Sequence, residues 1–256
     1  MSEAKKESKY KAPALEKGLE ILSELALAER PQTLTELAQR LGRTQGELYR
    51  MLIVLEHAGW LRRDEAERFT LTGKMLDLSL RHPPVRRLLD LALPLMRRFA
   101  DAHSQSCHLT LPHQGCGLVV ACAESPAELI TMVRPGARLK LSDSSTGLCL
   151  LAFGDESLGD EALASLSKKE RSDLEKQLKA SLASGHVMRP SRLIHGVTDL
   201  SVPVRWNPST PAWAALSCPC LLPPDGKIAA DSLLPDLKAA ATELAQALGA
   251  HGARLW

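Results

Sequence analysis

The sequence predicts an α+β protein with two domains, a small helical one at the N-terminus and a larger one built on an antiparallel sheet. Three observations lead to this prediction. The chain has 256 residues, which exceeds the usual length of one domain. Two short stretches with helix-capping signals follow each other before residue 60. Beyond residue 103, short apolar runs broken by glycine and proline replace the helical periodicity, so we place the second domain there.

The first helix is predicted from Pro13 to Glu29, with proline in the favourable first turn. Its apolar residues recur at three- and four-residue spacing, as one buried helix face requires. They are Leu15, Leu19, Ile21, Leu22 and Leu25. Residues 1–11 are polar and rich in lysine and lack the apolar segment of a secretory signal, so we expect a disordered lead-in there.

Two capping boxes of the form Thr-x-x-Glu predict the next two helices, at Thr33–Glu36 and at Thr44–Glu47. The first of these helices ends at Leu41-Gly42, because glycine favours a helix C-terminus, and the second runs to Ala58-Gly59. Two short helices across a tight turn form a helix-turn-helix. Segments 60–63 and 68–71, joined by a polar turn, predict a two-stranded hairpin, the wing. Together they predict a winged helix-turn-helix over residues 12–73.

A helix-turn-helix places its second helix in the major groove of DNA, where an arginine can pair with guanine. Arg50 lies on the face of that helix opposite Leu48 and Leu52, so it is the candidate base reader. Other side chains suited to phosphate or base contacts are Thr33, Thr44, Gln45, Tyr49, Arg62, Arg63 and Arg68. The alternative is a winged fold that binds protein, with its arginines solvated.

The charge of this region does not select DNA by itself. The chain carries a net charge of +2, and its first 80 residues hold 13 basic and 13 acidic side chains. Affinity for double-stranded DNA would therefore depend on the local placement of arginines. Paired half-sites on DNA further predict a homodimer or homotetramer.

Residues 74–103 are predicted to form a helical linker, with a short helix from Lys74 to Leu80 and an amphipathic stretch from Val85 to His103 that Pro94 interrupts. Residues 104–256 are predicted to form the second domain, an antiparallel sheet flanked by helices. The expected strands are 107–111, 117–123, 129–133, 200–204 and 212–218, and the expected helices are 146–153, 167–184 and 234–248.

The N-terminal region resembles the IclR-type transcription regulators, for example in the run Leu48-Tyr49-Arg50-Met51-Leu52. The other matching segments are 14–22, 33–38, 55–63 and 68–74, with fainter landmarks at 134–139, 145–147, 200–204 and 214–217. The resemblance implies a DNA-binding transcription regulator that acts without catalysis or a cofactor. It also implies a C-terminal domain similar to GAF domains, which binds a small-molecule effector that modulates operator binding.

The same landmarks locate candidate effector-binding residues. Ser144, Ser145 and Thr146 begin a predicted helix, whose free N–H groups favour an anionic or carboxylate ligand; simple N-capping is the alternative. Asp199 falls where relatives often have a pocket-facing cysteine or small residue, although it could be an exposed carboxylate at a strand end. Ser217 falls on the inner strand, and Leu129 and Met132 suit an apolar wall or the core.

Three features depart from the family pattern. Glu47 stands where relatives usually have a small or hydroxyl residue, and it either closes a capping box or adds negative charge near phosphates. Segment 186–192 is basic where relatives are acidic, and segment 206–211 is unusually rich in proline.

The six cysteines leave two further hypotheses open. With no signal peptide we expect reduced thiols in a cytoplasmic protein, and no run approaches the roughly 20 apolar residues that a membrane span requires. A metal- or thiol-redox-responsive regulator would use the cysteines and histidines instead of an organic effector. A cysteine-dependent enzyme would need Cys107 with His108, or Cys116 with His113, but adjacent strand residues point to opposite faces.

Overall fold

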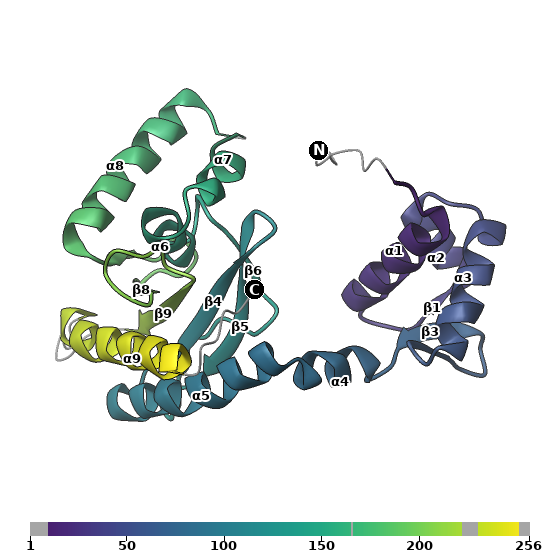
Figure 1. The fold of residues 1–256 in the computed structure, drawn as a ribbon, viewed down its shortest axis with the longest axis horizontal. Helices are drawn as coiled ribbons and strands as arrows, with labels where there is room; N and C mark the ends of the chain where they lie inside the picture. Colours follow the sequence, from purple (N-terminus) through teal and green to yellow (C-terminus); the bar gives the residue numbers. More distant parts are fainter. Residues whose placement is uncertain (1–9, 165, 222–229, 251–256) are drawn as a thin grey trace. The chain divides into compact units, whose positions relative to one another are not determined.

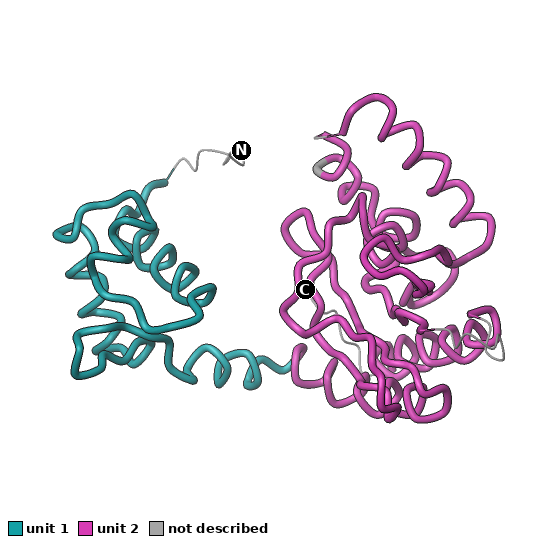
Figure 2. Tube along the Cα trace, turned by 180° about the vertical axis from the view of Figure 1, so that it is seen from behind, with its two compact units in different colours: residues 1–83 teal, residues 84–256 magenta. Residues whose placement is uncertain are grey.

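The computed structural model describes residues 10–164, 166–221 and 230–250. The expected disordered lead-in lies almost entirely outside the described residues. The chain divides into two compact units, and the boundary falls between Pro83 and Pro84 (Figure 2). Each unit has its own hydrophobic core.

The N-terminal unit is a winged helix-turn-helix, as the sequence predicts. Helices α1 (Pro13–Leu27), α2 (Leu34–Leu41) and α3 (Gln45–His57) pack beside a three-stranded sheet in the order β1 (Gln32–Thr33), β3 (Arg68–Leu71), β2 (Leu61–Arg63). Both capping boxes are present, at Thr33 with Glu36 and at Thr44 with Glu47. Gly42 ends α2 with a φ of 62°, a left-handed conformation that glycine adopts without strain.

The buried face of α1 differs from the predicted one. Leu15 and Leu19 are 62% and 54% exposed, and the helix instead packs through Gly18, Ile21, Leu22 and Leu25. Two overlapping stripes at three- and four-residue spacing exist on this helix, and α2 and α3 cover only one of them. Strand β1 was also not predicted, because two residues are too few to show the alternation of a strand.

The residues expected to form a linker are two helices, α4 (Lys74–Arg81) and α5 (Pro83–His103). The predicted interruption at Pro94 is wrong, because α5 continues through it. Proline removes one backbone hydrogen bond, but the opposite face of α5 buries Leu88, Met96 and Phe99 in the core of the C-terminal unit, which outweighs that loss.

The C-terminal unit contains a six-stranded antiparallel sheet in the order β6-β5-β4-β9-β8-β7 (Figure 1). Helices α5 and α9 cover one face, and α6 and α8 cover the other (Figure 1). This layout confirms the predicted α+β class. The strands are β4 (Cys107–His113), β5 (Cys116–Ala123), β6 (Arg138–Lys140), β7 (Val187–Pro190), β8 (Val197–Val204) and β9 (Ala214–Leu221). The helices are α6 (Ser145–Phe153), α7 (Ser157–Ala164), α8 (Lys168–Ser184) and α9 (Ala230–Ala250).

The strand predicted at 129–133 is absent from the structure, and this segment is a loop instead. Prolines flank the apolar run, and proline disfavours a strand. The free edge of β5, where the run could have paired, is occupied by β6. The short elements α7, β6 and β7 were not predicted from the sequence.

Alternation along the central strands sorts side chains between the two faces of the sheet. On β4, Cys107, Leu109 and Leu111 join the core beneath α5 and α9, while His108 faces α6. On β9, Leu216 and Cys218 lie in the same core, and Ser217 points to the α6 side. The face beneath α6 therefore gathers buried polar groups. Within the described part of the chain, no helix has both the length and the apolarity to cross a membrane.

Candidate DNA-binding surface and effector cavity

The exposed face of α3 presents the residues expected to read DNA. Arg50 is exposed and takes part in no ion pair within the described residues, and Tyr49 beside it is 50% exposed. Gln45, the first residue of α3, donates from Nε2 to Thr35 Oγ1 over 3.1 Å. The hydroxyls of Thr33 and Thr44 take part in the capping boxes of α2 and α3. Arg50 is thus a cation without a competing protein partner.

The three predicted arginines of the wing differ in whether they have acidic partners. Arg63 donates to Glu67 over 2.6 Å and to Glu56 over 3.3 Å, and these contacts raise the pKa of its guanidinium. Arg68 lies 2.9 Å from Asp64. Arg62 is exposed and, like Arg50, forms no ion pair in the part of the chain that the structure describes. The two unpaired arginines are the ones free to contact phosphate or bases.

Glu47 closes the capping box that its sequence position suggested, and two cations lie beside it. Its carboxylate closes the capping box with Thr44 and lies 2.9 Å from Lys17 Nζ and 3.9 Å from Arg43 Nη1. The backbone hydrogen bond from Thr44 and the bond from Lys17 hold the pKa of Glu47 at about 2. Its negative charge is therefore compensated within the protein. Sequence reasoning missed Lys17 because no local pattern links the residues of α1 and α3 that meet.

A cavity of about 140 Å³ lies in the C-terminal unit between the N-terminus of α6 and the strands β8 and β9. Six of the seven predicted effector residues line it: Met132, Ser144, Ser145, Thr146, Asp199 and Ser217. Leu129 is not among the lining residues and is 78% exposed. The sequence did not single out His108, Ser191, Leu193, Ile194 or Ser201 for this cavity, because strand pairing and loop closure bring them there.

A chain of hydrogen bonds runs along one wall of the cavity. Thr146 Oγ1 donates to Ser217 Oγ over 2.9 Å, and Ser217 Oγ donates to Ser201 Oγ over 2.8 Å. Because the Thr146 hydroxyl proton is used in this way, its oxygen accepts from His108 Nε2 at 3.2 Å. This assignment leaves His108 Nδ1 as an acceptor, and it is buried without a partner in the described structure.

Burial keeps the imidazole of His108 neutral, since desolvation lowers its pKa from 6.5 to about 4. Unfolded His108 binds a proton below about pH 6.5, whereas the folded form does so only below about pH 4. The contribution of His108 to the free energy of unfolding is therefore complete above pH 6.5 and falls as the pH drops from about 6.5 to about 4.

We expect the His108→Gln variant to lose this pH dependence. Urea midpoints measured at pH 5 and pH 7.5 should differ less in the variant than in the wild type, because every other titrating group is shared by the two proteins. Equal differences in both proteins would contradict the depressed pKa of His108.

Asp199 and the basic segment 186–192 meet at the other wall. Asp199 Oδ2 accepts from Ser145 Oγ over 3.1 Å, and Ser145 Oγ in turn accepts from Arg189 Nε over 2.8 Å. Burial raises the pKa of the half-buried Asp199, an effect that the hydrogen bond from Ser145 partly offsets. Arg189, opposite Asp199 in the pairing of β7 with β8, also donates to Gln177 and to the carbonyl of Asp143. Arg189 of the basic segment and Asp199 are therefore linked through the Ser145 hydroxyl.

Five of the six thiols lie in surroundings that disfavour reaction, whereas Cys116 is only partly buried and its Sγ donates to the carbonyl of His113 over 3.0 Å. Burial raises the pKa of Cys107 to about 12 and that of Cys122 to about 11, and the pKa of Cys149 also rises. Cys218 and Cys220 have their sulfur atoms 3.5 Å apart, and both are buried. A thiolate is the reactive form, so these cysteines are poor nucleophiles and poorly suited to sense redox changes. No group of three or more described histidine, cysteine or acidic residues is arranged to hold a metal ion.

A winged helix-turn-helix with unpaired arginines, joined to a domain with a ligand-sized cavity, defines a DNA-binding transcriptional regulator. Comparison with known families agrees: the IclR helix-turn-helix domain matches residues 14–65, and the bacterial transcriptional regulator IclR C-terminal domain matches residues 85–246. The chain belongs to the IclR family of transcriptional regulators.

Individual relatives are distant. The chain is 29% identical over 143 residues to the HTH-type regulator RhmR of Escherichia coli, a match that covers 56% of this chain and 55% of that protein. It is 26% identical over 199 residues to the glycerol operon regulatory protein of Streptomyces coelicolor, covering 75% and 78% of the two chains. An IclR homologue from Microbacterium hydrocarbonoxydans, crystallised with 4-hydroxybenzoate, has the same fold, with a TM-score of 0.79, 22% identity, and coverage of 93% and 99%.

Proposed function

We propose that a small molecule controls the binding of this regulator to its operator by occupying the cavity beside α6, and that this molecule is a hydroxylated organic acid. The observation that carries the proposal is one cavity that joins the first turn of α6 to the carboxylate of Asp199, a hydrogen-bond acceptor.

The anionic part of the effector would meet the first turn of α6. The first amides of an α-helix have no intrahelical acceptor, and the helix dipole favours negative charge there. Ser144 Oγ already accepts from the amide of Gly147 over 2.9 Å, which leaves the amides of Ser145 and Thr146 for a carboxylate. The anionic effector expected from the sequence is therefore supported on this side.

Asp199, which accepts a hydrogen bond from Ser145 in the same turn, calls for a hydrogen-bond donor beside the anionic group. A carboxylate in contact with Asp199 would be repelled, whereas a hydroxyl can donate to Asp199. The ligand of the Microbacterium structure, 4-hydroxybenzoate, carries both a carboxylate and a hydroxyl group, which supports a ligand of this class for the present chain.

We also propose a homodimer or homotetramer as the DNA-bound form. Leu15 and Leu19 of α1 and four apolar residues of α4 are exposed within the N-terminal unit: Met75, Leu76, Leu78 and Leu80. Exposed apolar residues at this density are typical of a surface that a second subunit covers, and paired half-sites require two reading helices. Light scattering should give two or four times the chain mass of 27.8 kDa.

The effector proposal is tested with pairs of acids that differ by one hydroxyl, such as 4-hydroxybenzoate with benzoate and lactate with propionate. Thermal shift identifies a binding pair, and a mobility-shift assay with DNA from upstream of the gene measures the effect on operator affinity. We expect the hydroxylated member to bind about ten-fold more tightly, and Asp199→Asn to reduce that preference. If no acid binds, or if the non-hydroxylated members bind better, the proposal is wrong.

A further inference from the structure

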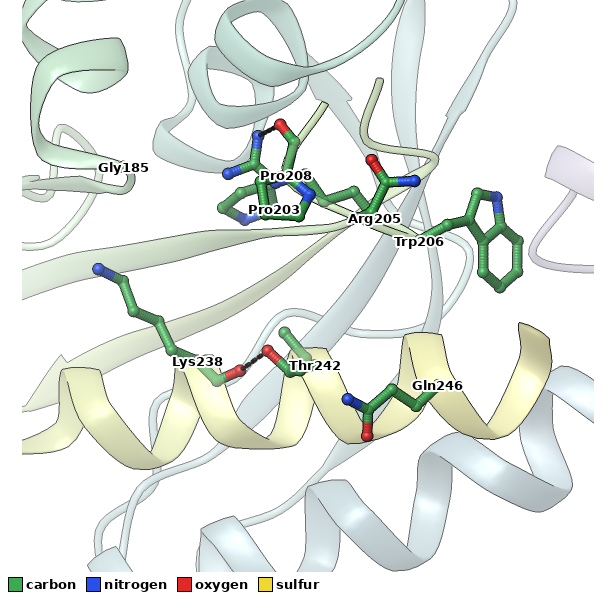
Figure 3. Close-up of a pocket in the computed structure, with 10 residues that line it drawn as sticks. Gly185, Pro203, Arg205, Trp206, Pro208, Lys238, Thr242 and Gln246 are labelled. Carbon is green, nitrogen blue, oxygen red and sulfur yellow. Dashed lines mark hydrogen bonds between the residues drawn. The ribbon is translucent and has the colours of Figure 1, made fainter. Parts of the chain in front are cut away.

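A second and larger cavity, of about 430 Å³, lies in the C-terminal unit along α9, beside the end of β8 and the segment that follows it (Figure 3). Its walls include Arg205, Trp206, Asn207, Lys238, Thr242 and Gln246. None of its lining residues lines the effector cavity. It also gives a place in the structure to the proline-rich segment 206–211, which had no role in the functions considered so far.

The charge of this cavity is positive. Arg205 and Lys238 are its two ionisable lining residues, and neither forms an ion pair within the described part of the chain. The nearby acids of α9 are used elsewhere, since Asp236 lies 2.8 Å from His103 and Glu243 contacts Arg98, both on α5. Asp236 and Glu243 of α9 thus contact α5, whereas Lys238 of the same helix lines the cavity.

Arg205 is held in place before any ligand arrives, and Lys238 lies beside the end of a helix. Arg205 Nη1 donates to the carbonyl of Pro208 over 2.9 Å, and the guanidinium lies 5.7 Å from the centre of the Phe153 ring. Lys238 extends from α9 toward Gly185, and its Nζ would lie 4.0 Å from a Cβ at that position (Figure 3). Gly185 ends α8, and the C-terminal end of a helix favours a cation. Fixed cations cost less ordering entropy when they bind an anion.

An aromatic surface completes the cavity. Trp206 lies at the end away from Gly185, where Gln246 also lies (Figure 3). Its ring stacks on Trp213 with the ring centres 5.3 Å apart, which fixes its position, yet the residue remains 38% exposed. A Cβ at Gly249 would also lie 3.5 Å from Trp206 Cε3, so the exposed part of this fixed indole is the apolar surface that a planar ring can contact.

We propose that this cavity is a second ligand site, which binds a small organic anion carrying an aromatic ring. The anionic group lies between Arg205 and Lys238, and the ring lies against Trp206. The site is independent of the effector cavity, so the two proposals can fail separately.

The test uses the full chain and phenyl phosphate, which joins a dianion to a ring, in isothermal titration calorimetry. We expect one phenyl phosphate per chain at this site, with weaker binding of inorganic phosphate and of phenol. Lys238→Gln should weaken the binding of phenyl phosphate about ten-fold, as the loss of one charge-assisted hydrogen bond does, and Lys238→Arg should restore most of it.

Lys179→Gln is the matched control, because Lys179 is an exposed lysine of α8 that does not line the cavity. It should bind phenyl phosphate as the wild type does. Melting temperatures of all variants exclude unfolding as the cause of a loss. Absence of phenyl phosphate binding at millimolar concentration overturns the proposal, and so does equal affinity in the wild type and Lys238→Gln.

Discussion

Replacing Gly147 with alanine should destabilise the C-terminal unit by about 3 kcal/mol or more, because the added methyl group would overlap the backbone of residues 140 and 141. A Cβ at Gly147 would lie 2.5 Å from Leu141 Cα and 2.5 Å from the carbonyl oxygen of Lys140. Backbone atoms cannot rotate away as a flexible side chain can, so α6 would have to move away from residues 140 and 141. Urea denaturation followed by circular dichroism measures the loss of stability.

Gly159→Ala serves as the control for this substitution. Gly159 lies in α7 of the same unit, and the nearest atom to an added Cβ is 3.8 Å away on the Leu163 side chain. Alanine there should be neutral or stabilising by up to about 1 kcal/mol, because it favours the helix. If Gly147→Ala were as stable as Gly159→Ala, the tight packing of the first turn of α6 would be disproved.

Replacing Arg50 with alanine should weaken operator binding by about 1 to 3 kcal/mol per half-site, or roughly five- to 150-fold. Arg50 is exposed and unpaired within the described structure, so its removal should leave the stability of the N-terminal unit nearly unchanged. Fluorescence anisotropy with an operator duplex and a scrambled duplex, at one salt concentration, separates specific from general binding.

Two further arginine variants make the Arg50 result interpretable. Arg62→Ala should weaken binding to both duplexes equally and lower the salt dependence by about one counterion, as expected of a phosphate contact. Arg171→Ala removes the same charge from α8 in the other unit and should leave DNA binding unaffected. An equal loss on both duplexes for Arg50→Ala would show that Arg50 contacts phosphate and does not read bases.

Local rules were sufficient to predict α2, α3 and the wing of the N-terminal unit. The capping boxes at Thr33 and Thr44 specify where α2 and α3 begin, and both were found as predicted, because each depends only on residues three positions apart. The wing followed from the alternation on either side of its turn.

Features that depend on distant segments were not predictable in the same way. Leu15 and Leu19 have the spacing of a buried face, yet burial depends on which side of α1 the other helices cover. The apolar run 129–133 has the composition of a strand, but β6 takes the neighbouring place in the sheet. The partnership of Lys17 with Glu47 likewise joins residues thirty positions apart.

The effector cavity illustrates both situations. Landmarks of the family placed Ser145, Asp199 and Ser217 together, and they do line one cavity, although their role in binding remains a proposal. His108 was considered only as a partner of Cys107, because the sequence does not reveal that β4 lies beside β9 and presents the imidazole to Thr146.

The strand order of the C-terminal unit has a consequence for synthesis on the ribosome. β4 pairs with β9, so that His108 stands opposite Ser217, more than 100 residues further along the chain. Until the last strand emerges, a nascent chain exposes β4 as an open sheet edge, the kind of edge that pairs wrongly with other chains. The N-terminal unit, which ends at Pro83, can fold long before. Proteins truncated ahead of residue 214 should therefore accumulate as folded N-terminal units attached to an aggregating remainder.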